Sequence, residues 1–166
     1  LSDCSATLDD YAEIWSVAPG TTFGDIVSLG TNEVTSTETT ASGGTRVTKI
    51  VQLVKTSASY QTSVVGIVSD NYHDLSSIGH GSIQDKDNPM PVALVGRVPV
   101  NVTNENGPIS VGDFLTTSST PGKAMKATRS GRVIGMALGS FTGVSGQVAV
   151  QVLNTFWQSP GEYQGG

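Results

Sequence analysis

The sequence has one cysteine, few aromatic residues and few charges. Cys4 is the only cysteine among the 166 residues, so no disulfide can form within one chain. Charged residues make up 14% of the chain, against roughly 25% in an average soluble domain. No apolar run reaches the ~18 residues that a membrane-spanning helix needs. These shortages exclude a disulfide scaffold, a long charged helix and a helical membrane span.

Positive charge is missing from the first part of the chain. Residues 1–45 contain no Lys or Arg, and the whole chain has a net charge of −5. Such a balance argues against nucleic acid or an anionic membrane as the main partner. Five of the nine basic residues lie between Arg97 and Arg132. We expect the acidic head and this basic segment either to pair between subunits or to be solvated surface.

Helix signals are scarce and strand signals are frequent. The most helix-like stretch, residues 8–14, is too short to form a helix by itself. Short β-branched runs bounded by turn residues predict strands at residues 50–54, 63–68, 92–102, 132–138 and 147–153. In the last of these, Val148, Val150 and Val152 alternate with polar or small residues, as in a half-buried strand. The sequence therefore predicts an all-β fold.

A weak internal duplication runs through the chain. Residues 19–28 resemble residues 106–116, and each segment has a turn, a Gly-Asp pair and the start of a strand. The distance from this Gly to a later strand glycine is 42 residues in the first copy (24 to 66) and 23 in the second (112 to 135). The difference of 19 predicts an inserted loop or hairpin near residues 31–47. We expect one compact domain of two pseudo-repeated halves, with short strands and long loops.

We predict a β domain at residues 14–154, between an extended segment (1–13) and a flexible tail (155–166). The tail has no periodicity and no apolar face. Because the sequence starts at Leu1 and not at methionine, we expect a processed product or a piece of a longer protein.

Candidate chemistry is limited to one polar loop. Both histidines, His73 and His80, lie in it beside Tyr72, and we consider these three residues a hypothetical ligand-binding set. The loop is also rich in Asp and Asn, but its spacing fits no metal-binding signature, so we expect neither a metal nor another cofactor. No serine stands in a nucleophile-elbow motif and no glycine loop fits a phosphate. We therefore do not expect an enzyme acting on other molecules.

Several motifs in order resemble one known family. They are Asp-Tyr-Ala-Glu at 10–13, the run at 91–100, Asn-Gly-Pro-Ile at 106–109, Gly-Asp-Phe-Leu-Thr-Thr-Ser at 112–118 and the segments at 120–127 and 133–138. Together they resemble the C-terminal β domain of bacterial surface-fibre and phage-appendage proteins, which is related to the peptidase G2 family of autoproteolytic intramolecular chaperones. The resemblance covers roughly residues 9–154, and residues 91–138 are its most specific part.

The resemblance implies a β-rich module on an elongated, often trimeric, extracellular or virion protein. We therefore predict a structural subunit or terminal module of an extracellular filament, pilus or fibre, whose partners are copies of itself. Residues 1–13 could add a strand to the sheet edge of a neighbour. The alternatives are an adhesin-type module for sugar or protein on a cell surface, and a self-cleaving chaperone domain in which a serine such as Ser2 or Ser5 attacks the adjacent peptide. The residues that we expect at subunit contacts are Cys4, Asp10, Tyr11, Glu13, Phe156 and Trp157.

Overall fold

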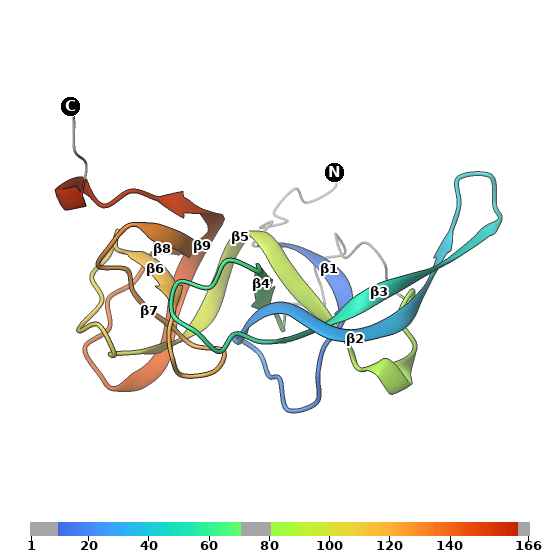
Figure 1. Cartoon of the computed structure of the whole chain (residues 1–166), viewed down its shortest axis with the longest axis horizontal. Coiled ribbons are helices and arrows are strands. Elements are labelled where there is room, and N and C mark those ends of the chain that lie inside the picture. Colours follow the sequence, from blue (N-terminus) through green and yellow to red (C-terminus); the bar gives the residue numbers. More distant parts are fainter. Residues whose placement is uncertain (1–9, 71–80, 163–166) are drawn as a thin grey trace, which may run out of the picture.

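The computed structural model describes residues 10–70 and 81–162 and confirms an all-β protein (Figure 1). These residues form nine strands and two short 3₁₀-helices, and they contain no α-helix. The strands are β1 (Asp10–Ser16), β2 (Ile26–Thr39), β3 (Thr45–Lys55), β4 (Val64–Val68), β5 (Pro89–Thr103), β6 (Phe114–Thr117), β7 (Ala124–Lys126), β8 (Gly131–Ala137) and β9 (Ser145–Trp157). The 3₁₀-helices are η1 (Asp85–Asp87) and η2 (Pro160–Glu162).

The first five strands close into a barrel, here called the first barrel. Residues 89–96 of β5 pair with β1 along one edge, and residues 92–93 pair with β4 along the other. Strand β4 pairs with β2, and β2 pairs with β3. A parallel bridge between Val17 and Leu53 then returns from β3 to the end of β1. Closing the ring leaves fewer free backbone groups at sheet edges.

The remaining strands close into a second barrel that shares β5 with the first. Residues 96–103 of β5 pair with β9, β9 pairs with β8, and β8 pairs with β6. Strand β6 pairs with β7, and a parallel pair between Val102 and Ala124 returns from β7 to β5. The order of pairings and the position of the single parallel contact are the same as in the first barrel. The two pseudo-repeated halves predicted from the sequence are therefore confirmed.

The shared pairing order gives a residue-by-residue correspondence between the halves. Gly24 corresponds to Gly112, Val17 to Val102 and Leu53 to Ala124, because each pair occupies the same place in its barrel. Strand β1 corresponds to the second part of β5, β2 to β6, β3 to β7, β4 to β8 and the first part of β5 to β9.

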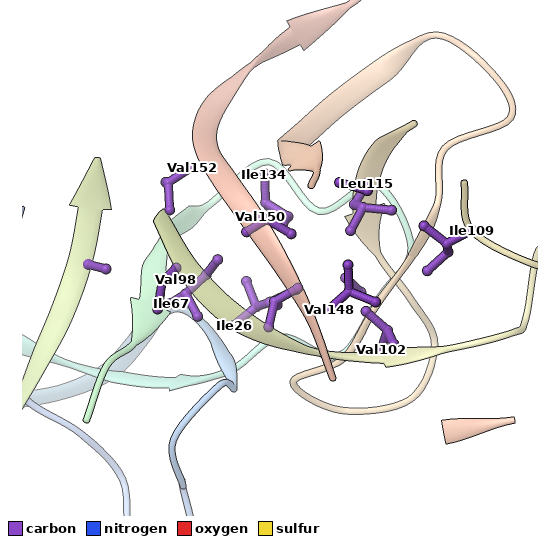
Figure 2. Close-up of a cluster of buried hydrophobic side chains, with 14 of the residues drawn as sticks. Ile26, Ile67, Val98, Val102, Ile109, Leu115, Ile134, Val148, Val150 and Val152 are labelled. Atoms are coloured by element: carbon purple, nitrogen blue, oxygen red, sulfur yellow. The ribbon is translucent and has the colours of Figure 1, made fainter. Parts of the chain in front are cut away.

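Inward-facing side chains, which alternate along each strand, fill the barrels with Val, Ile and Leu. The first barrel is filled by Val17, Val27, Leu53, Val68 and Val92. A larger cluster fills the second barrel and extends into the first half. Figure 2 shows Val150, Ile134 and Leu115 gathered in this cluster, with Ile26 and Ile67 of the first half beside Val98. One continuous cluster of buried apolar side chains therefore joins the two barrels.

The predicted insertion is a hairpin that extends β2 and β3 beyond the first barrel, and we call residues 33–51 the arm. Its strands pair from Glu33 opposite Val51 to Thr39 opposite Thr45. Figure 1 shows the arm projecting at one end of the molecule, opposite the second barrel. The arm also contacts the loop before η1, because the Thr37 backbone N–H donates to the Ser82 carbonyl at 2.9 Å.

Regular structure extends past the expected boundaries at residues 13 and 155. The helix-like stretch at residues 8–14 overlaps β1, in which Tyr11 pairs with Val95 and Glu13 with Val92. Pairing with a strand about 80 residues away decides this conformation, which local periodicity does not reveal. At the other boundary, β9 continues to Trp157 because its last residues pair with β8.

Candidate interaction surface

Each half contains a Gly-Asp turn with the same internal geometry. In the first, the Thr22 N–H donates to Asp25 Oδ2 at 2.9 Å, and in the second the Ser110 N–H donates to Asp113 Oδ2 at 2.8 Å. A lysine lies 3.6 Å from each carboxylate, Lys55 in the first half and Lys126 in the second. Both glycines have φ near +90°, a conformation that favours glycine. Local sequence therefore builds the same turn twice.

In the first half this turn is the contact with the second barrel. The Asn101 N–H donates to the Gly24 carbonyl at 2.9 Å, and Asn101 Nδ2 donates to Asp25 Oδ1 at 2.8 Å. A Cβ added to Gly24 would lie 2.8 Å from Asn101 Oδ1, which leaves no room for a side chain. The Asp25 side chain is 5% exposed. A buried carboxylate thus joins the two halves.

In the second half the same turn is open. A Cβ added to Gly112 would meet no atom within 4 Å. The Asp113 side chain is 23% exposed, and Val111, which corresponds to Phe23, is 67% exposed. Leu138 is also exposed, whereas the corresponding Ser69 is buried. Among the described residues, the second half therefore leaves exposed the Gly-Asp turn that the first half buries against the second barrel.

A row of side chains beside the turn shows the same contrast. Register places Ile26 next to Ile67 and Ile67 next to Ala93, and all three are buried within the shared cluster. The corresponding row in the second half crosses β6, β8 and β9, and its members are partly or fully exposed. They are Phe114, Met136 and Gln151.

The end of β9 lies next to this second row. Trp157 stacks on Phe114 with ring centroids 5.3 Å apart and an interplanar angle of 29°. Phe156 pairs in register with Arg132 and is 65% exposed. In the first half, the segment that corresponds to the end of β9 is the part of β5 that continues into the second barrel. We call Val111, Phe114, Met136 and Leu138 the open face.

The expected contact residues lie on separate strands. Asp10, Tyr11 and Glu13 belong to β1, while Phe156 and Trp157 belong to β9. Among the described residues these two strands pair with β5 and not with each other. Residues 10–13 pair within their own chain, so this part of the segment is not free to add a strand to a neighbour. Other candidates lie outside the described residues, namely Cys4, Ser2, Ser5, Tyr72, His73 and His80.

Sequence reasoning singled out Phe156 and Trp157 but missed the open face. The signal for Val111 was present in the duplication, because aligning the Gly-Asp pairs puts it opposite Phe23. Nothing in the sequence shows that Val111 is 67% exposed and Phe23 only 38%.

Shallow cavities lie at two places on the described part of the chain. One shallow cavity lies where Phe23 meets Pro99 and Gln147, and another at the base of the arm is lined by Glu33, Lys49 and Asp87. Within residues 10–70 and 81–162, no group of three or more His, Cys, Asp or Glu side chains is placed to hold a metal ion. The same residues include no helix of the length and apolarity required to cross a bilayer.

No protein-family model matches this sequence, and no curated protein matches it with significant similarity.

Proposed function

We propose that this protein is a structural subunit of an extracellular filament, pilus or fibre and that it acts by assembling with copies of itself. The observation that carries the proposal is the tandem barrel whose internal contact surface recurs, uncovered, on the second barrel. Apolar side chains grouped in this way commonly mark interaction surfaces. The low-charge, Gly-rich composition is typical of surface proteins, and the motifs that resemble fibre domains agree with this role.

The shape of the molecule suits a building block. Strand β5 runs for 15 residues and belongs to both barrels, so the hydrogen bonds of both barrels fix their relative position. A rigid pair of modules transmits force and position along an assembly better than two modules on a flexible linker. We place the protein outside the cell, at a cell surface or on a virion.

Size-exclusion chromatography with light scattering, followed by negative-stain electron microscopy, tests this function. The whole purified chain should form filaments or defined oligomers as its concentration rises. A chain that stays monomeric up to the highest concentration that can be reached would contradict the proposal. The adhesin and self-cleavage alternatives stay hypotheses, and the residues that we named for them lie outside the described part of the chain.

A further inference from the structure

We infer that copies of this chain dock head to tail, with the open face of one copy seated on the first barrel of the next. The inference rests on the proposed function and names the surfaces that would produce the assembly. Within one chain, the first barrel already docks on the second through its Gly-Asp turn and its buried row. The second barrel carries the same turn and row with no neighbour at the turn.

The surface that receives the open face follows from the correspondence between the halves. In the internal contact, the first turn seats on Pro99, Asn101 and Gln147, which lie on β5 and β9. The residues at the same places in the first barrel are Ile14, Ser16 and Pro89 on β1 and β5. Ile14 and Pro89 are partly exposed, whereas Ser16 is buried and its hydroxyl donates to the Asp87 carbonyl. We therefore place the receiving surface on β1 and the start of β5.

The arm lies where a second contact is expected. In the internal contact, the turn between β6 and β7 reaches the first half, because the Ile26 N–H donates to the Gly122 carbonyl and the Gly122 N–H donates to the Thr56 carbonyl, both at 2.9 Å. The corresponding connection in the first barrel is the one between β2 and β3, which is extended into the arm. In a head-to-tail stack the arm therefore extends toward the preceding copy.

The open face and the receiving surface are different parts of the chain, because the open face lies on β6, β8 and the second turn, and the receiving surface lies on β1 and the start of β5. A contact between two different surfaces does not close on itself and continues into a filament.

The first test places charges on the open face. In V111E/L138E, two exposed apolar residues become acidic, and the association constant from sedimentation velocity should fall at least tenfold. The matched control is V95E, because Val95 is 54% exposed, lies outside the open face and pairs with Tyr11, at the other end of β1 from Ser16. The control should assemble like the unchanged chain. Circular dichroism and thermal unfolding should show that both variants are folded.

The second test identifies the partner surface by disulfide trapping. The double variant V111C/I14C is made in a C4S background. Val111 and Ile14 correspond to Phe23 and Pro99, and those two residues lie close enough within one chain to line the same cavity. Oxidation of the double variant should give a ladder of covalent multimers on a non-reducing gel. Each single variant should give no ladder.

The outcomes separate the inference from the function on which it rests. Assembly by V111E/L138E like the control, with no ladder from the cysteine pair, would overturn the head-to-tail contact and leave the filament function standing. Efficient dimers of V111C alone would also overturn it, since they would show a symmetric contact between two open faces. A chain that is monomeric at every concentration would overturn both proposals.

Discussion

The clearest prediction compares two aspartates that have the same local turn and different surroundings. Asp25 lies at the contact between the barrels, and Asp113 lies at the open face. Replacing each by alanine removes one turn hydrogen bond and one lysine contact. Only Asp25→Ala also removes the hydrogen bond from Asn101 Nδ2. The difference between the two variants therefore measures the contact between the halves.

The expected loss of stability follows from the groups left without a partner. Hydrogen bonds to a charged group contribute about 1.5–3 kcal/mol each, so losing the two at the buried Asp25 should cost about 3–6 kcal/mol. The lysine contacts add little, because the side chains of Lys55 and Lys126 are each 37% exposed. Asp113→Ala loses one turn hydrogen bond at a partly exposed position and should cost about 1 kcal/mol. We expect a difference of at least about 2 kcal/mol.

Equilibrium unfolding in urea, followed by tryptophan fluorescence, provides the measurement. Trp15 reports on the first barrel and Trp157 on the second. A double-mutant cycle between Asp25→Ala and Asn101→Ala should give a coupling energy of about 1–2 kcal/mol. The reasoning is refuted if the two aspartate variants lose the same stability within about 0.5 kcal/mol, the usual error of such comparisons.

Three further predictions concern packing, the arm and the loop between β3 and β4. Gly66→Ala should cost about 3 kcal/mol or more in the same unfolding assay, because the new Cβ would lie 2.3 Å from the Ala93 carbonyl oxygen, and tolerance of alanine would contradict the described register. Replacing residues 34–50 by a two-residue turn should leave both barrels folded, with near-UV circular dichroism retained, because the arm lies outside both cores; loss of the folded signal would contradict this. Tyr60→Phe should cost about 1 kcal/mol, since the hydroxyl accepts the N–H groups of Thr128 and Arg129, and an unchanged urea midpoint would argue against that contact.

The sequence by itself determined five of the nine strands, the turns and the duplication. Alternation of Val148, Val150 and Val152 places one face of β9 in the core, and each Gly-Asp pair forms its turn from neighbouring atoms. The unequal distances between matching glycines located the arm. These features depend on interactions between residues close in the chain or on simple periodicity, so they can be read without the fold.

Only the tertiary structure decided how the barrels close and which copy of a repeated surface stays open. The strand at residues 10–16 exists because it pairs with β5, and the first barrel closes through Val17 and Leu53, 36 positions apart. Ile26 and Phe114 occupy corresponding places, yet one is buried and the other partly exposed. Burial depends on what another part of the chain covers. The second barrel covers this surface of the first half, whereas only the end of β9 lies against the corresponding surface of the second half.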